Sequence, residues 1–142
     1  MLTSIINLIS GKIQIEVSPD RFVFTRNDEV KSLKTTVFLS DDSKKRRVLG
    51  IGDDFVATQP NVCIRLFQEN DAGILPALGK SECLDAYFTY AFRLITRRSA
   101  FVRPLVVFRN SESLNTLLCG YQDKVLLNSA MNAGARECIF ES

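Results

Sequence analysis

The chain has 142 residues, of which 46% are hydrophobic and 24% are charged, and its formal net charge is +2. These values exclude a disordered or fibrous protein. They are typical of one folded domain that can bury a core without stabilising disulfides or metal ions. Lys and Arg number 18 against 16 Asp and Glu. Because the two signs are so nearly balanced, the charge indicates no nucleic-acid partner.

The sequence contains no histidine. This absence excludes His-based general acid–base catalysis, Ser-His and Cys-His nucleophile pairs, and most zinc sites. The four cysteines lie far apart and form no C-x-x-C pair. We therefore expect no metal site and interpret the cysteines as buried, reduced side chains of a cytoplasmic protein. They are Cys63, Cys83, Cys119 and Cys138.

The first residues have the spacing of a short amphipathic helix. Its apolar face consists of Leu2, Ile5, Ile6 and Ile9. There is no basic n-region that would indicate a secretory signal, and no apolar run reaches the roughly 20 residues that span a bilayer. The helix could lie in a membrane interface or cover an apolar groove of its own domain. The membrane is not favoured over the groove, because the polar face of the helix lacks the Lys and Arg that strengthen interfacial binding. We predict that these four residues contact lipid or a protein partner.

Period-two alternation begins after Gly11. It predicts strands at 13–17, 21–26 and 35–39, with turns between them. Because the connections are short, we expect an antiparallel meander.

From about 41 to 76 the pattern becomes irregular and predicts a small insertion. It contains an apolar stretch at 48–52, a possible helical turn at 53–57 and another apolar stretch at 62–67. The basic run at 44–47 directly follows acidic residues, so we interpret it as a solvated hairpin tip.

The second part of the chain is more regular. Ser81 and an apolar stripe at helical spacing predict a helix over 81–98, and the apolar run 103–108 predicts a strand covered on both faces. A second helix is expected to be capped by Ser111 or Ser113 and to end near Gly134. Its predicted inward residues are Leu114, Leu117, Leu118, Tyr121, Val125 and Leu126. Residues 138–140 supply a last strand.

The predicted order is therefore β-β-β, an irregular insertion, then α-β-α-β. Right-handed crossovers would place parallel strands beside the antiparallel meander in one mixed sheet. This is an α/β fold of the ribonuclease-H-like type, and we expect a single half-domain over 1–142. Actin-type ATPases contain two such units.

Several segments resemble MreB, the bacterial actin homologue, in the order in which that family has them. The most specific is 128–141, which contains Gly-Ala-Arg-Glu and is similar to the family's "esA.gAGAREv.lie". Residues 103–108 resemble its "RPrvvv" strand, 71–74 its D-G-V-I turn and 58–62 its "tPgnI", and the start of the chain resembles the family's N-terminus. The resemblance implies an actin-like half-domain that corresponds to the N-terminal half of MreB.

The same resemblance implies a degenerate phosphate turn. Where the family's first strand ends in D-x-G-T-a-N, this chain has Glu16, Ser18, Pro19 and Asp20. Pro19 has no N–H to donate, the glycine that lets phosphate approach is missing, and the acidic residues would repel a triphosphate. We therefore expect neither a catalytic residue nor a bound cofactor. The alignment does not decide whether Glu141 matches the family's glutamate that positions the attacking water.

These features predict a non-catalytic, MreB-like structural or interaction protein of cell-shape or filament assembly. We expect it in the cytoplasm or peripherally on the inner face of the membrane. Its partner would be itself, a full-length actin-like protein or the membrane surface. Two alternatives stay open: a subunit that binds ATP and Mg²⁺ by completing its cleft with a second chain, and a monomeric protein-binding module.

Overall fold

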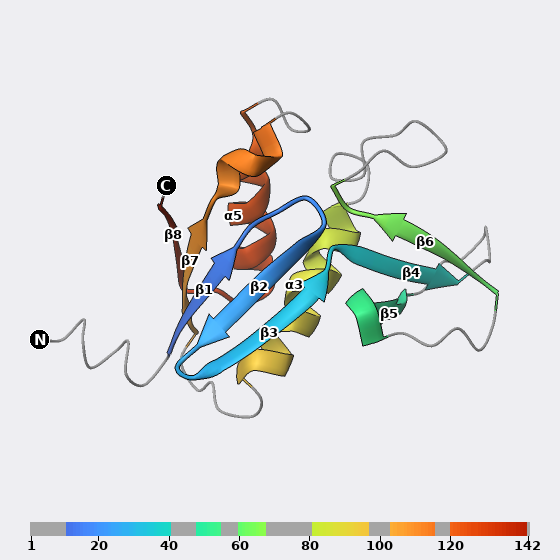
Figure 1. The fold of residues 1–142 in the computed structure, drawn as a ribbon, viewed down its shortest axis with the longest axis horizontal. Helices are drawn as coiled ribbons and strands as arrows, with labels where there is room; N and C mark the ends of the chain where they lie inside the picture. Colours follow the sequence, from blue (N-terminus) through green and yellow to red (C-terminus); the bar gives the residue numbers. More distant parts are fainter. Residues whose placement is uncertain are drawn as a thin grey trace, which may run out of the picture.

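The computed structural model describes residues 11–40, 48–54, 60–67, 81–96, 103–115 and 120–141 (Figure 1). Within these ranges the strands form a five-stranded sheet of order β3-β2-β1-β7-β8 and a three-stranded sheet of order β5-β4-β6. The strands of the five-stranded main sheet are β1 (Lys12–Glu16), β2 (Arg21–Arg26), β3 (Glu29–Lys34), β7 (Leu105–Arg109) and β8 (Glu137–Glu141). Those of the second sheet are β4 (Thr36–Ser40), β5 (Val48–Ile51) and β6 (Asn61–Arg65).

The main sheet is mixed, as the sequence predicted. β1 pairs antiparallel with β2, and β2 with β3, whereas β1 pairs in parallel with β7, and β7 with β8. Helix α3 (Ser81–Thr96) precedes β7, and helix α5 (Gln122–Asn132) connects β7 to β8. Both helices lie on one face of the sheet (Figure 1). That face receives the apolar residues of the alternating strands, so the core lies between sheet and helices.

The prediction that residues 35–39 form the third strand of the meander was wrong. The third strand of the main sheet is β3, and the segment predicted for it belongs mostly to β4 of the second sheet. β3 is an edge strand in which Val30 is 60% exposed and Leu33 is the one buried residue, so no apolar alternation marks it. Thr35 alone separates β3 from β4, so the second sheet directly follows the meander of the main sheet.

The predicted long second helix is interrupted. A 3-10 turn, η2 (Ser111–Leu114), is followed by α5, which begins only after Gly120. Gly120 has a φ of +91°, a left-handed conformation that does not continue a helix. Tyr121, predicted to point inward, is 64% exposed, whereas Leu114 and Leu126 are buried as predicted.

The predicted start of the first helix and the predicted end of the second agree with the structure. α3 begins at Ser81, and its predicted last residues, 97 and 98, lie outside the described residues. Gly134 has a φ of +113° and its N–H donates to the Met131 carbonyl at 3.1 Å, so it closes α5 as predicted. The predicted inward residues 117 and 118 lie outside the described residues.

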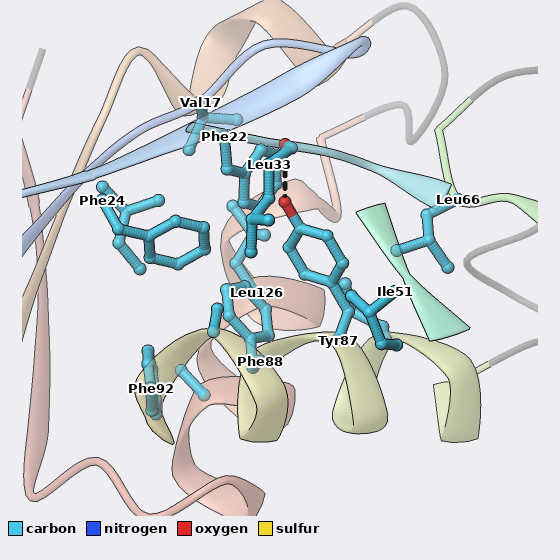
Figure 2. Close-up of a cluster of buried hydrophobic side chains, with 14 of the residues drawn as sticks. Val17, Phe22, Phe24, Leu33, Ile51, Leu66, Tyr87, Phe88, Phe92 and Leu126 are labelled. Atoms are coloured by element: carbon cyan, nitrogen blue, oxygen red, sulfur yellow. Dashed lines mark hydrogen bonds between the residues drawn. The ribbon is translucent and has the colours of Figure 1, made fainter. Parts of the chain in front are cut away.

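Aromatic side chains form the centre of the core (Figure 2). Phe88 of α3 is fully buried, and five aromatic rings have their centroids within 6.5 Å of its own. These neighbours are Phe22, Phe24, Tyr87, Phe92 and Phe108. Because they come from β2, α3 and β7, Phe88 joins the meander to the parallel part of the sheet.

Tyr87 is the polar member of this cluster. Its hydroxyl donates a hydrogen bond of 2.9 Å to the Leu33 carbonyl (Figure 2), and burial raises the pKa of Tyr87 well above the ordinary value of a tyrosine. We expect Tyr87→Phe to lower the free energy of unfolding by about 1 kcal/mol near neutral pH. The Tyr87 contribution is fully present below pH 10 and is lost as the pH rises above it, because the unfolded chain then ionises first.

Urea unfolding of both proteins at about pH 8 and about pH 10.5 tests this prediction, and the two pH values are chosen to lie on either side of the ordinary tyrosine pKa. The wild type should lose more stability between the two pH values than Tyr87→Phe does. Equal stability of the two proteins at the lower pH would contradict the hydrogen bond.

The prediction that the cysteines are buried is confirmed only in part. Cys83 is buried and Cys138 is half-buried, with its pKa raised by burial to about 11, but Cys63 is exposed. Cys63 lies on β6 next to buried Ile64, and neighbouring residues of a strand point to opposite faces, so it was wrongly predicted to be buried.

Cys119 lies outside the described residues, as do the basic run 44–47 and the apolar residues Leu2, Ile5, Ile6 and Ile9. Among the described helices, none is long and apolar enough to cross a membrane.

Candidate functional site

The residues predicted to replace a phosphate loop form the turn Val17–Asp20, which joins β1 to β2. β1 and β7 are parallel neighbours, with Glu16 opposite Arg109, so the turn lies beside the segment that follows β7. The carboxyl ends of parallel strands are the usual place for ligands in such sheets. The position of the turn is therefore that of a binding site, and its hydrogen bonds decide what it can hold.

The first half of the turn is bonded to the segment after β7. The Val17 N–H donates to the Arg109 carbonyl at 2.9 Å. The Val17 carbonyl accepts two hydrogen bonds of 3.1 Å, from the Asn110 side-chain amide and from the Ser113 hydroxyl. Ser113 was predicted to cap a helix, but its hydroxyl is used here instead.

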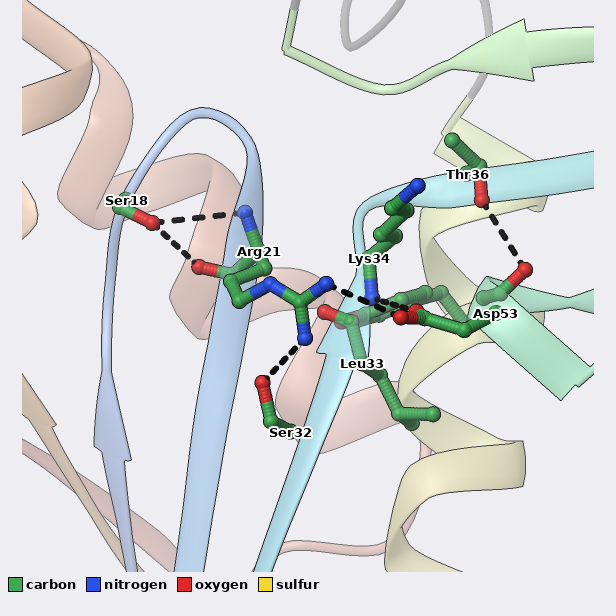
Figure 3. Close-up of polar contacts among 9 residues, drawn as sticks. Ser18, Arg21, Ser32, Leu33, Lys34, Thr36 and Asp53 are labelled. Carbon is green, nitrogen blue, oxygen red and sulfur yellow. Dashed lines mark hydrogen bonds and ion pairs between the residues drawn. The ribbon is translucent and has the colours of Figure 1, made fainter.

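The second half of the turn is bonded to itself and to the junction between the sheets. The Ser18 hydroxyl donates to the Arg21 carbonyl at 2.5 Å and accepts from the Arg21 N–H at 3.3 Å (Figure 3). The Thr35 hydroxyl donates to the Pro19 carbonyl at 2.6 Å, and the Thr35 N–H donates to the Asp20 carbonyl at 3.0 Å. Thr35 is 3% exposed, so these bonds hold the turn from inside the protein.

Several donors of this turn and of the residue after it are already bonded within the chain. The N–H groups of Val17 and Arg21 are bonded in this way, and Pro19 has none. The Ser18 hydroxyl also donates to the backbone. Phosphate loops depend on several backbone N–H groups directed at the ligand, so each of these bonds reduces what the turn can offer an anion. We call Val17–Asp20 the closed turn.

The predicted acidic residues are not brought together as a metal site. Glu16 is exposed on β1, and Ile15 and Val17 on either side of it are buried, so it lies on the face of the sheet away from the helices. Among the described residues no group of three or more potential metal ligands occurs.

Arg109 lies between two glutamates in the sheet register. It is opposite Glu16 on β1 and opposite Glu141 on β8, and its guanidinium forms a 3.2 Å ion pair with Glu141. The Arg109 guanidinium is therefore paired with a carboxylate of the neighbouring strand. Sequence reasoning missed Arg109, although it is the first polar residue after the buried run of β7.

Asp53 ties the second sheet to the main sheet (Figure 3). It belongs to the 3-10 turn η1 (Gly52–Asp54) that follows β5. One carboxylate oxygen forms a 2.9 Å ion pair with Arg21, and the other accepts the Lys34 N–H at 2.7 Å. The Thr36 hydroxyl adds a 3.3 Å bond to the Gly52 carbonyl. Partial burial opposes ionisation, but the Lys34 N–H and the Arg21 guanidinium together lower the pKa of Asp53.

We expect Asp53→Ala to lower the free energy of unfolding by about 1 kcal/mol, an estimate reduced because solvent screens the pair. Since the pKa of Asp53 is lower in the folded chain, its contribution is fully present above the ordinary pKa of an aspartate and is lost as the pH falls through the folded pKa. Chemical unfolding at neutral pH and near pH 3 measures both effects. Asp53→Asn, which keeps an acceptor for Lys34, should lose less at neutral pH, and a loss equal to that of alanine would contradict the role of this bond.

A cleft of about 480 Å³ lies between the two sheets, beside the closed turn. Its lining residues are Asp20, Arg21, Lys34, Thr35, Thr36 and Arg65. The Arg21 guanidinium is bonded to Asp53, and the hydroxyls of Thr35 and Thr36 donate to backbone carbonyls. The polar groups of this cleft therefore mainly hold the two sheets together.

Comparisons with known proteins agree with this architecture. No family model matches the sequence, and no curated protein matches it either. Among solved structures, the crystal structure of MreB 5 of Spiroplasma citri bound to AMPPNP matches with a TM-score of 0.60 over 93% of this chain. The chain has an MreB-like fold. The two sequences are 12% identical, so the match shows the fold alone, and this chain spans 38% of the length of that one. The resemblance read from the sequence is thus confirmed for the fold.

Proposed function

We propose that the chain is a non-catalytic, MreB-like structural or interaction protein with one ribonuclease-H-like unit. Its fold is that of an actin-like protein, and the observation that carries the proposal is the closed turn. The proposal is supported by the hydrogen bonds within the chain that use the Val17 N–H, the Arg21 N–H and the Ser18 hydroxyl at this place. What remains is a rigid scaffold with surfaces for association, and no bound cofactor is proposed.

The electrostatics beside the turn support the same proposal. A triphosphate approaching this edge would meet the exposed carboxylates of Glu16 and Asp20, while the cation at the end of β7, Arg109, is paired with Glu141. Hydrolysis also needs groups that stabilise the charge developing on the transferred phosphoryl group. The alternative of an ATP-binding subunit requires a second chain to bring those groups and to open the turn.

The proposed partners are a second copy of the chain, a full-length actin-like protein or the inner face of the membrane. Sedimentation velocity over a range of concentrations, with and without Mg²⁺-ATP, tests the self-association. We expect association that depends on protein concentration and is the same with or without nucleotide. Association only with Mg²⁺-ATP would favour the ATP-binding alternative. A monomer at all concentrations that also fails to sediment with liposomes or actin-like filaments would favour the monomeric binding module.

The proposed membrane contact rests on the apolar spacing of Leu2, Ile5, Ile6 and Ile9. Replacing Ile5 and Ile6 with lysine should abolish liposome co-sedimentation of the full chain, because burying two ammonium groups in an apolar interface is unfavourable. The variant should keep its cooperative unfolding transition. Loss of that transition would instead assign the segment to the protein core, and a wild type that never sediments with liposomes would exclude the membrane contact.

A further inference from the structure

A second cavity, of about 280 Å³, lies at the opposite end of the main sheet from the closed turn. It is bounded by the last turns of α3, the residues before β7 and the residues after α5. Its walls include Phe92, Arg93, Thr96, Arg103, Pro104 and Ala133. Pro104 precedes β7, whereas the segment that bonds the closed turn follows β7, so the two places are separated by the length of that strand.

The charged side chains among the described lining residues of this cavity are all positive. Arg93 and Arg103 are both exposed, and neither forms a hydrogen bond or ion pair within the part of the chain that the structure describes. No acidic residue is among the described lining residues. The sequence also contains no acidic residue between Asp85 and Glu112. Two guanidinium groups at one cavity therefore lack a counter-charge in the described chain.

The walls between the two arginines are apolar and fixed. Phe92 is 5% exposed and Pro104 is buried, and the Pro104 carbonyl accepts the Arg136 N–H at 2.8 Å. The Thr96 hydroxyl donates to the Phe92 carbonyl at 2.6 Å, so it is not a free donor. Arg93 and Arg103 are the charged donors at this cavity, whose lining also includes Phe92 and Pro104, here called the apolar floor.

A stabilising effect at the end of a helix accounts for the position of Arg93 but not for that of Arg103. Arg93 lies in the last turn of α3, where a cation offsets the negative end of the helix. Arg103 lies on no helix and gains nothing from that effect. The helix end also weakens the attraction of an anion, so a ligand here has to engage both guanidinium groups.

We propose that this cavity binds a carboxylate side chain from an acidic segment of a partner protein. Arginine presents paired N–H groups that match the two oxygens of a carboxylate, and the apolar floor can receive the methylene groups of glutamate. A lipid surface fits less well, because the large apolar side chains exposed in the described chain do not line this cavity. The proposal does not depend on whether the closed turn binds nucleotide.

Fluorescence anisotropy with a labelled, end-capped hexaglutamate peptide tests this site in the full chain at low salt. We expect saturable binding, no binding of hexaglutamine, and an affinity about tenfold lower for Arg93→Gln/Arg103→Gln. Ala133→Leu, which fills the cavity without changing charge, should weaken binding similarly. Lys31→Gln/Lys124→Gln is the matched control, because it removes two exposed charges from β3 and α5, and it should change the affinity less than about twofold.

Three results would overturn the proposal. They are the absence of saturable peptide binding to the wild type, an equal loss in the lysine control, and binding of phosphatidylglycerol vesicles through the two arginines without peptide binding. Circular dichroism checks the fold of each variant. Should the double arginine variant not fold, Arg103→Gln alone and Ala133→Leu provide the same comparison, and undiminished binding by both would contradict the site.

Discussion

Phe88→Ala is expected to lower the free energy of unfolding by about 4 kcal/mol, the largest effect of any substitution considered. Phe88 is fully buried and is surrounded by the rings of β2, α3 and β7. Removing its ring leaves a cavity among rigid aromatic side chains from several elements, and these cannot all move inward to fill it. The loss should therefore lie toward the upper part of the range for such truncations.

Guanidinium chloride unfolding, followed by tyrosine fluorescence and circular dichroism, measures this loss. Leu127→Ala is the matched control, because Leu127 is 36% exposed on α5 and its truncation should change stability by less than about 1 kcal/mol. A loss below about 2 kcal/mol for Phe88→Ala would show that the core between the sheet and α3 is not packed as described.

Asn110→Ala is expected to lower the free energy of unfolding by about 2 kcal/mol. Asn110 has a φ of +64°, a left-handed conformation that asparagine tolerates and alanine does not. Its side-chain amide also donates to the Val17 carbonyl at 3.1 Å, so the substitution removes one of the bonds that close the turn. Backbone strain and the lost hydrogen bond act in the same direction.

Two further variants separate these causes. Asn110→Gly relieves the strain but still lacks the hydrogen bond, so it should lose about half as much stability as alanine. Ser113→Ala removes the other donor to the Val17 carbonyl, at 3.1 Å, without affecting a left-handed residue. If alanine and glycine at position 110 were equally destabilising, the left-handed backbone would not be the cause. Denaturant midpoints of the variants at one pH provide the comparison.

The sequence was sufficient to predict the parts of the fold that local patterns determine. α3 has a helix-starting serine and a continuous apolar stripe, β7 is an apolar run buried on both faces, and Gly134 closes α5 as glycine commonly does. Their order predicted the mixed sheet. The MreB-like fold that the comparison confirms was predicted from the resemblance of several segments to that family. In each case the signal lies within a few neighbouring residues.

Features that depend on distant partners could not be predicted. β3 is an exposed edge strand without apolar alternation, and the break before α5 depends on a single left-handed residue, Gly120. The sequence predicted a turn without glycine, with Pro19 and acidic residues, but not the hydrogen bonds that close it. Its closure requires Asn110, which is 93 residues from Val17 in sequence, and the neighbouring clamp requires Asp53, which is 32 residues from Arg21. A pattern of neighbouring residues does not predict pairs that are so far apart in the sequence.

The proposal that the closed turn holds no nucleotide is tested most directly by isothermal titration calorimetry of the full chain with Mg²⁺-ATP. The Val17 N–H, the Arg21 N–H and the Ser18 hydroxyl are already bonded within the chain, so they are not free to bind a triphosphate. We predict no saturable heat at millimolar nucleotide, and the same result for Asn110→Gly. A saturable heat that disappears when Mg²⁺ is removed would contradict the account and support a nucleotide-binding protein.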